Sequence, residues 1–338
     1  MRMTIKEIAR LSGVSQSTVS KIINNYDDVG SETKNKVLQI MKEHGYRPSY
    51  SAQSLAKKVT HVIGVIYAGR VNADFNHPFF VDVLNAFKNS VGRLGYDLMF
   101  FSNEHFHEGD EDFLERCRHY NVDGCIIIGG ETIQPSVYAL DQSEIPCVGI
   151  DLTLRGKNST YLMTDNDEML AKVIEHFYLE GHRDIGFIGG QKPSTIARLR
   201  LDAFHSAMRS YQLHVNEDWI YEGDFFEQSG YEAMRSFLQQ ETVPSAIFAA
   251  SDLMAIGALR ALKEAGVPLR SYSIIGCDDI DAAQYVDPSL TTIRQNKEKI
   301  GQLASRLLKD LIDENMHGVE RLVEPELVIR ASSNPVEN

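Results

Sequence analysis

The sequence has no uninterrupted apolar run of the roughly 18 to 20 residues that a membrane-spanning helix needs. Its N-terminus lacks a charged segment followed by an apolar run and a small-residue cleavage site, so we expect no secretory signal and a cytoplasmic protein. Its four cysteines, Cys117, Cys125, Cys147 and Cys277, show neither CxxC nor zinc-like spacing. This pattern favours reduced, buried thiols over disulfides or a metal centre.

Catalytic motifs are also missing. The eleven histidines include no HExxH pair, and no Ser/His/Asp or Cys/His arrangement has a recognisable catalytic context. The glycine-rich run at 186–190 falls short of GxGxxG, and the acidic cluster Asp278, Asp279 and Asp281 lacks the other positions of an EF-hand loop. We therefore expect no enzyme, no cofactor and no metal site.

The charge of the chain is unevenly distributed. Overall the 338 residues carry a formal net charge of −13. Residues 1–61 contain ten basic and five acidic residues, a net charge of +5, whereas the remainder contains 24 and 42, a net charge of −18. A basic head on an acidic body indicates nucleic-acid binding through the head alone.

Residues 4–24 have the pattern of two short helices joined by a tight turn. Thr4 and Glu7 have the spacing of a capping box that starts the first helix, and Ser15 is placed to cap the second. Gly13 between them can adopt the positive φ that such a turn requires. This is the pattern of a helix-turn-helix unit, whose second helix enters the major groove of DNA. An ordinary helical hairpin remains the alternative from the pattern alone.

The residues of this segment resemble the DNA-binding domain of the lactose-repressor/galactose-repressor (LacI/GalR) family. The matching runs are IKEIA at 5–9, SGVS at 12–15 and TVSK at 18–21, followed by Asn24, with Lys21 where the family usually has arginine. The resemblance implies a sequence-specific DNA-binding regulator, expected to be a repressor, that acts as a homodimer on a two-fold operator of double-stranded DNA. The residues expected to contact DNA are Thr4, Ser15, Gln16, Ser17, Thr18, Ser20, Lys21, Asn24, Thr33, Ala52, Leu55 and Ala56.

A third helix is expected over 31–44, which completes a helix-turn-helix domain over residues 1–47. Residues 48–61 follow as a linker, in which the segment 49–58 has about ten residues and is too short to hold a helix alone. By the resemblance this linker is a hinge helix that orders only when two copies pair in the minor groove, where Leu55 wedges between base pairs. A plain flexible linker is the alternative.

From residue 62 onward, apolar runs bounded by Gly and Pro alternate with segments of helical length, which is typical of buried parallel strands. The runs are VIGVIY (62–67), YDLMFF (96–101), GCIII (124–128), PCVGI (146–150), DIGFIG (184–189), SAIFAA (245–250) and SIIGC (273–277). They predict two doubly wound α/β subdomains that bind a ligand at the carboxyl ends of the strands.

The body over 62–338 also resembles the periplasmic-binding-protein-like effector domain of the same family. By this resemblance the N-subdomain covers about 62–163 and 293–322, and the C-subdomain about 164–292 and 323–333. The chain would then cross between them near Thr164, near 291–295 and near Val323. No apolar heptad follows the last strand, so we expect no tetramerisation tail.

Polar residues just after the apolar runs, together with nearby aromatic residues, are candidates for a carbohydrate site. Carboxylates and a guanidinium can form paired hydrogen bonds with sugar hydroxyls, and an aromatic ring can cover the C–H face of a sugar. The residues expected to contact the effector are Phe79, Asp151, Arg198, Phe225, Ser251, Asp278 and Gln295. Arg198 and Asp278 coincide with the most reliable effector contacts of the family.

Each of these residues has a plainer structural interpretation. Arg198 could form a surface ion pair, and Asp278 or Asp279 could cap a helix. Phe79 and Phe80 could both belong to the core. Asp165 and Asn166 are expected to cap a helix rather than bind the ligand.

The sequence therefore predicts a cytoplasmic repressor controlled by a small ligand, expected to be a sugar or sugar phosphate. A family member controlled by a phosphoprotein corepressor remains an alternative, and so does a sugar-binding transport receptor. The missing signal sequence and the basic head argue against the receptor.

Overall fold

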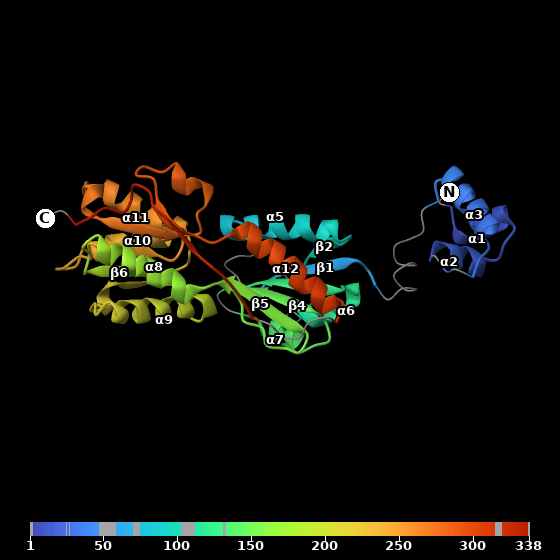
Figure 1. The fold of residues 1–338 in the computed structure, drawn as a ribbon, viewed down its shortest axis with the longest axis horizontal. Helices are drawn as coiled ribbons and strands as arrows, with labels where there is room; N and C mark the ends of the chain where they lie inside the picture. The colour runs from blue at the N-terminus through green and yellow to red at the C-terminus, as the bar shows by residue number, and fades with distance from the viewer. Residues whose placement is uncertain are drawn as a thin grey trace. The chain divides into compact units, whose positions relative to one another are not determined.

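The computed structural model describes residues 3–24, 26, 28–46, 59–69, 75–102, 112–130, 133–314 and 320–336. The chain divides into two compact units, Met1–His61 and Val62–Asn338. Figure 1 labels many of their helices and strands. Within the described ranges, no helix is both long and apolar enough to span a membrane.

The described part of the first unit contains three helices, α1 (Ile5–Ser12), α2 (Gln16–Ile23) and α3 (Ser31–Glu43). The predicted capping box is confirmed, because the Thr4 side chain accepts from the backbone of Glu7 while the Glu7 side chain accepts from the backbone of Thr4. Gly13 ends α1 with a φ of 72°, as the tight turn requires. A small core closes the unit; its buried members are Ile8, Ala9, Val19, Ile22, Val37 and Met41.

The second unit is built on two six-stranded sheets. The first has the strand order β11-β5-β4-β3-β1-β2 and is parallel throughout. Its strands are β1 (Val62–Tyr67), β2 (Asp97–Phe100), β3 (Gly124–Ile128), β4 (Cys147–Ile150), β5 (Ser159–Thr164) and β11 (Glu320–Val323).

The second sheet has the order β12-β10-β9-β8-β6-β7, and in it only β12 is antiparallel to its neighbour. Its strands are β6 (Ile185–Gly190), β7 (Ile220–Gly223), β8 (Ala246–Ala249), β9 (Ser273–Cys277), β10 (Thr291–Arg294) and β12 (Glu326–Val328). The predicted fold class is confirmed: a helix-turn-helix head is joined to an α/β body of two doubly wound subdomains, each built on a mainly parallel sheet.

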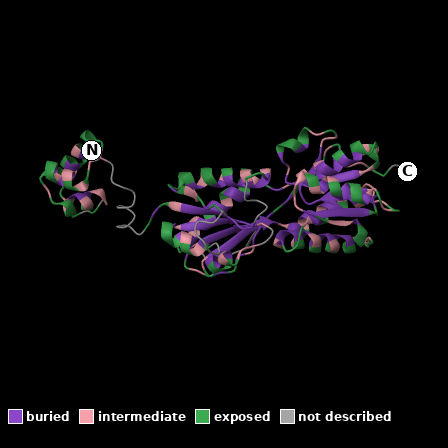
Figure 2. Cartoon of the chain, turned by 180° about the vertical axis from the view of Figure 1, so that it is seen from behind, coloured by how far each residue is buried: buried purple, intermediate pink, exposed green. Residues whose placement is uncertain are grey.

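Helices cover both faces of each sheet, and strands lie buried between them (Figure 2). The first sheet packs with α5 (Pro78–Arg93), α6 (Phe113–Tyr120), α7 (Pro135–Asp141) and α12 (Lys297–Ile312). The second packs with α8 (Asn166–Leu179), α9 (Thr195–Ser210), α10 (Glu227–Phe237) and α11 (Asp252–Glu264). Short 3₁₀ turns occur at Glu217–Trp219, Leu269–Ser271 and Asp281–Gln284.

The chain passes from one sheet to the other three times. The passages follow β5, β10 and β11, so neither sheet is made from one continuous piece of sequence. At the first two passages Thr164 and Gln295 are joined, with the Thr164 hydroxyl donating to the Gln295 Oε1 at 2.5 Å. This places Gln295, which follows β10, where the two layers meet.

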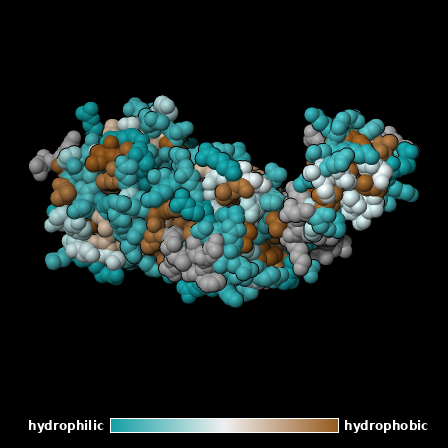
Figure 3. Space-filling model, turned by 45° about the vertical axis from the view of Figure 1, so that its right-hand side comes forward, coloured by the Kyte–Doolittle hydropathy of each residue, from teal (hydrophilic) through white to brown (hydrophobic). Residues whose placement is uncertain are grey.

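Surface character is uneven. On the face seen in Figure 3, hydrophilic residues cover much of each unit and hydrophobic residues gather in separate patches. The most exposed large apolar side chains of the body are Tyr285, Leu179 and Ile329. Single exposed apolar residues are ordinary on a folded protein and need no separate account.

Candidate functional site

The second helix of the head presents a polar face to solvent. Gln16, Ser17 and Lys21 are exposed on α2, while Val19 and Ile22 on its other side are buried. The Ser15 hydroxyl accepts from the backbone N–H of Thr18 at 3.0 Å and therefore caps the helix. The Ser17 hydroxyl lies 2.7 Å from that of Ser15, and the exposed Gln16 side chain lies in the first turn, where a recognition helix contacts base edges.

Two residues predicted to contact DNA, Lys21 and Asn24, form contacts within the head itself. Lys21 forms an exposed ion pair with Asp28, and this pair holds the pKa of the Asp28 carboxyl below its usual range. The Asn24 amide donates to the backbone carbonyl of Ser20 at 2.9 Å. Exposed ion pairs contribute little to stability, so Lys21 can exchange Asp28 for a phosphate at little cost.

The remaining predicted DNA contacts are less accessible or outside the described residues. Thr4 is exposed but participates in the capping box of α1, and Thr33 is half-buried in the first turn of α3. Ala52, Leu55 and Ala56, in the expected hinge, lie outside the residues that the structure describes.

The body contains a pocket of about 440 Å³, including its opening to solvent, at the carboxyl ends of strands from both sheets. Its polar lining residues are His77, Asp151, Ser194, Arg200, Ser251, Asp278 and Gln295. Its apolar lining residues are Phe79, Phe80, Gly129, Gly130, Ile196, Phe225 and Ala250.

Six of the seven residues predicted to contact the effector line this pocket: Phe79, Asp151, Phe225, Ser251, Asp278 and Gln295. Phe79 lies at the start of α5, and the other five follow the ends of β4, β7, β8, β9 and β10. Phe79 is also part of the core packed against α12 and the first sheet, so the core interpretation and the pocket interpretation both hold for it. Ser251 caps α11 and donates to the Phe225 carbonyl at 2.8 Å.

Arg198 is the exception, and its predicted place in this pocket is wrong. Its side chain is 64% exposed and pairs with Asp202 one turn further along α9, at 3.4 Å. Arg200, which is 3% exposed, lines the pocket instead. Two residues span about 200° around an α-helix, so Arg198 and Arg200 project from nearly opposite sides of α9.

Arg200 is held by three acceptors around its guanidinium. It donates from Nη1 to the Ala250 carbonyl at 2.7 Å, from Nε to Asn166 Oδ1 at 3.2 Å and from Nη2 to Gln295 Oε1 at 3.5 Å. Burial acts to lower the pKa of Arg200, but the nearby Cys277, Asp151 and Asp278 raise it above its ordinary value. The pocket therefore contains a fixed, buried cation.

Asp278 offers this pocket a carboxylate oxygen without a partner. The Gln295 amide donates to its Oδ1 at 2.7 Å. Its Oδ2 is buried and accepts no hydrogen bond within the described part of the chain, with His77 Nε2 4.0 Å away. Burial and the neighbouring Asp252 raise the pKa of Asp278. Buried polar atoms in folded proteins nearly always have partners, so this oxygen indicates a place for a ligand.

His77 was not among the predicted contacts, although it immediately precedes Pro78 and the two phenylalanines of the pocket. It is 5% exposed, and its ring meets that of Phe226 edge-on at 5.6 Å. Burial, with a smaller contribution from Arg200, lowers its pKa from 6.5 to about 4, so the ring is neutral at pH 7. Its Nδ1 is also buried without a hydrogen-bond partner among the described residues.

The backbone of the pocket is strained at several points. Asp151, Phe225, Asp278 and Asp279 all have positive φ, between 51° and 123°. Such conformations are uncommon in residues other than glycine and are concentrated at functional sites, where the surrounding structure enforces them.

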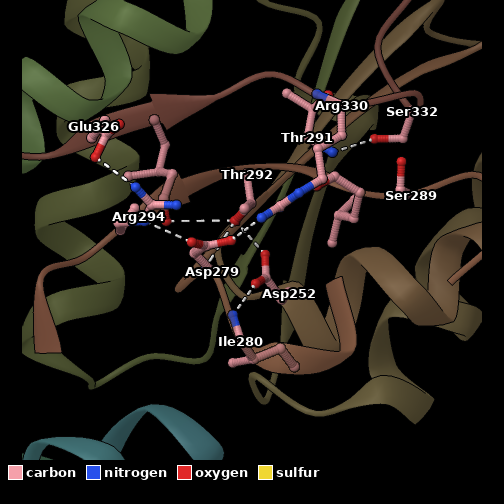
Figure 4. A network of polar contacts seen from close by, with 12 residues as sticks. Asp252, Asp279, Ile280, Ser289, Thr291, Thr292, Arg294, Glu326, Arg330 and Ser332 are labelled. Carbon is pink, nitrogen blue, oxygen red and sulfur yellow. Dashed lines mark hydrogen bonds and ion pairs between the residues drawn. The ribbon is translucent and has the colours of Figure 1, made fainter. Parts of the chain in front are cut away.

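A network of polar contacts beside the pocket holds the strained segment (Figure 4). Asp279 accepts from Arg294 Nε at 2.7 Å and from Arg330 Nη2 at 2.6 Å. Burial raises the pKa of Asp279, but these two arginines outweigh it and leave the pKa below its usual value. Asp252 accepts from the backbone of Ile280 at 2.8 Å and from the Thr292 hydroxyl. The expected helix cap is not seen, because Asp278 and Asp279 bond to Gln295 and to the arginines instead.

The other acidic and amide residues noted in the sequence have structural roles. Asp165 caps α8 by accepting from the backbone of Glu168 at 3.0 Å, as expected. Asn166 contributes to the Arg200 site rather than to a cap. No group of three or more metal-ligating side chains occurs among the residues that the structure describes.

Two family models match the chain. Residues 4–49 match the family described as bacterial regulatory proteins, lacI family, and residues 174–333 match the periplasmic binding protein-like domain. The chain is also similar over nearly its whole length to the HTH-type transcriptional repressor PurR of Pasteurella multocida (strain Pm70). The two are 36% identical over 334 residues, which cover 97% of this chain and 98% of the relative.

Solved structures of transcriptional regulators are also similar to this chain. The lac repressor dimer bound to operator and the anti-inducer ONPF is similar with a TM-score of 0.82 and 27% identity, covering 99% of this chain and 100% of that one. The transcriptional regulator CelR in complex with cellobiose is similar with a TM-score of 0.73 and 28% identity, covering 98% and 100%. The chain therefore belongs to the lacI family of bacterial regulatory proteins, which are DNA-binding transcriptional regulators and not enzymes.

Proposed function

We propose that this protein is a repressor whose affinity for its operator is set by a small carbohydrate bound in the pocket between the two sheets. The observation that carries this proposal is the buried, unpaired Asp278 Oδ2, which lines the same pocket as the buried guanidinium of Arg200. A hydroxyl group can donate to the carboxylate and accept from a guanidinium, so a polyol satisfies both. Phe79, Phe80 and Phe225 would cover the apolar face of a sugar ring.

The lining of the pocket and two similar solved structures support a neutral sugar. The pocket contains one permanent cation, Arg200, and two carboxyl groups, Asp151 and Asp278, while His77 is neutral at pH 7. Burial raises the pKa of both carboxyl groups, so each can donate to a neutral hydroxyl as well as accept from it. Among similar solved structures, one regulator is described with cellobiose and another, from Enterococcus faecium, with bound ribose. Both are carbohydrates without a charged group.

The proposed mechanism links two distant parts of the chain. The sheet of β1–β5 and β11 and the sheet of β6–β10 and β12 would act as the N- and C-subdomains, and a sugar between them would change their relative rotation. In a homodimer this change would alter the spacing of the two hinge segments at 48–61, and hence their pairing in the minor groove of a two-fold operator. Such couplings amount to about 1 to 3 kcal/mol, or roughly 5- to 150-fold in affinity. Because the protein acts on DNA, we place this function in the cytoplasm of its bacterium.

The test is operator binding by the full-length protein with and without a panel of neutral sugars and sugar phosphates. We expect at least one neutral sugar to change the operator dissociation constant by roughly 5-fold or more. A panel without any effect, together with tight binding of a phosphoprotein to the body, would favour the corepressor alternative.

The head gives a separate prediction about sequence preference. Replacing Gln16 with alanine should relax the base preference at one position of each half-site, because a side chain that reads a base edge contributes about 1 to 3 kcal/mol of discrimination. A selection experiment on randomised operators measures this. Gln39→Ala is the matched control, since Gln39 is exposed on α3 and bonds to Glu43. An unchanged sequence logo for the Gln16→Ala variant would contradict the assignment of α2 as the recognition helix.

His77 predicts a loss of stability in acid. Its pKa of about 4 in the folded protein lies below the ordinary 6.5. As the pH falls from 6.5 towards 4, the unfolded chain therefore binds a proton at this histidine and the folded chain does not, which favours unfolding. The groups facing it are Arg200, Asp278 and the backbone of Phe225. Between pH 7.5 and pH 5 the wild-type protein should lose about 2 kcal/mol more than His77→Asn in its free energy of unfolding. Urea unfolding at both pH values measures the difference, and equal losses in the two proteins would contradict it.

A further inference from the structure

A second and larger pocket lies between helix α9 and the strands β6 and β7 of the second sheet. It has about 850 Å³ of empty space, including its opening to solvent, compared with about 440 Å³ for the first pocket. It is bounded by the ends of β6 and β7 and by the side of α9 that carries Arg198. Ser194, the cap of α9, lines both pockets, so the first turn of this helix separates them.

The lining of this pocket is mainly apolar with a cationic rim. Its walls include two aromatic and two aliphatic side chains, Phe187, Tyr221, Leu201 and Ile220. Its charged lining residues are Lys192, Arg198 and Glu222. The lining therefore has a net charge of +1, in contrast to the first pocket with its two carboxyl groups.

Arg198 and Lys192 both have N–H donors beyond those used in their ion pairs. Arg198 has five N–H donors, and the structure uses one of them, Nη1, in a 3.4 Å contact with Asp202, which is not part of the lining. Lys192 pairs with Glu222 at 2.9 Å through one of its three donors. All four side chains are about half exposed or more, and ion pairs of that kind are easily exchanged.

This pocket also lies against the first. Gly190 lines it, and a Cβ at Gly190 would overlap the ring of Phe225, which lines the first pocket. The two cavities are thus separated by the Phe225 ring and by the first turn of α9. A molecule in the second pocket would contact the same helix that carries Arg200.

We propose that this second pocket binds a small aromatic anion, a ring that bears one carboxylate or phosphate group. The ring would lie between Tyr221 and Leu201, and the anionic group would be bound by the free donors of Arg198 and Lys192. A guanidinium matches both carboxylate and phosphate geometry, so the two anions share one recognition chemistry here.

Calorimetric titration of the full-length protein with 1-naphthoate and 1-naphthyl phosphate tests the proposal. We expect at least one of them to bind saturably with one molecule per chain, and Arg198→Ala to weaken that binding by about tenfold or more. Arg209→Ala is the matched control, because Arg209 is exposed in the last turn of the same helix and outside the pocket. The control should keep the affinity of the wild type. Comparison of the two probes shows which anion the pocket prefers.

Two further ligands and one further variant test the chemistry of the ligand and the location of its site. Neutral 1-naphthol lacks the anionic group, and inorganic phosphate lacks the aromatic ring. Each should therefore bind at least about tenfold more weakly than the better probe. Asp278→Asn, which alters only the first pocket, should retain binding of the probe. The proposal is overturned if neither probe binds saturably, if 1-naphthol binds as well as the anions, if Arg209→Ala weakens binding as much as Arg198→Ala, or if Asp278→Asn abolishes it.

Discussion

Replacement of Arg200 with methionine should abolish the response of operator binding to the effector and lower the free energy of unfolding by about 3 kcal/mol or more. Removing one member of a buried charge cluster leaves the others uncompensated, which typically costs 3 to 5 kcal/mol. Without Arg200, the buried carboxyl groups of Asp151 and Asp278 would lose the nearby cation. The Ala250 carbonyl would also lose its hydrogen-bond donor. Effector titrations and urea unfolding measure the two effects.

Arg198→Met is the control for this experiment. Arg198 lies two positions earlier on the same helix, but its side chain is exposed and its pair with Asp202 is a surface pair. We expect a change in unfolding free energy within about 0.5 kcal/mol and an intact effector response. If Arg198→Met, rather than Arg200→Met, lost the response, the assignment of the first pocket as the effector site would be wrong.

A milder variant keeps the test informative if Arg200→Met fails to fold. Arg200→Lys retains the charge but cannot donate to Ala250, Asn166 and Gln295 at once. It should fold and bind operator while losing most of its effector affinity. Full effector affinity in this variant would show that charge alone, without the planar donor geometry, is sufficient.

Replacement of Gly257 with alanine should destabilise the body by about 1 to 3 kcal/mol and weaken effector binding as well. Gly257 is buried on α11, and an added Cβ would overlap the carbonyl oxygen of Glu227 on α10. The two helices must then separate. Helices α10 and α11 begin next to Phe225 and Ser251, which line the first pocket. Separation of the two helices would therefore move these pocket residues and weaken their contacts with the ligand.

The same substitution at Gly92 provides a control of opposite sign. Gly92 is an exposed residue of α5, and nothing lies within 4 Å of an added Cβ. Alanine there should stabilise the protein by up to about 1 kcal/mol, because glycine is the poorer helix former. Chemical denaturation of both variants measures the pair. A Gly257→Ala variant as stable as Gly92→Ala would show that α10 and α11 separate without cost.

The strands that could be predicted are those whose sequence is mainly apolar. The runs at 62–67, 124–128 and 273–277 coincide with β1, β3 and β9, because a parallel strand covered by helices on both sides must be apolar throughout. β5 and β10 were not among the predicted runs, since STYLMT and TTIR contain threonines whose burial is possible only through specific partners. The Thr292 hydroxyl, for example, donates to Asp252. No local pattern reveals a partner 40 residues away.

The pocket was predictable to the extent that it follows strand ends. Asp151, Asp278 and Gln295 each come directly after a strand, and the carboxyl ends of parallel strands share one edge of a sheet. Arg200 lies on a helix, where the side that faces the pocket depends on how α9 packs. His77 reaches the pocket from the start of α5, and only the three-dimensional fold brings it within 4.0 Å of Asp278, two hundred residues later.

The three passages of the chain between the sheets have a consequence for any attempt to divide this protein. A fragment that ends after β5 would lack β11 and α12, and a fragment that begins at α8 would carry both without the layer they belong to. Neither half of the gene therefore encodes a half of the body that can fold unaided, and a single proteolytic cut within α8 should leave two pieces that stay together until denatured.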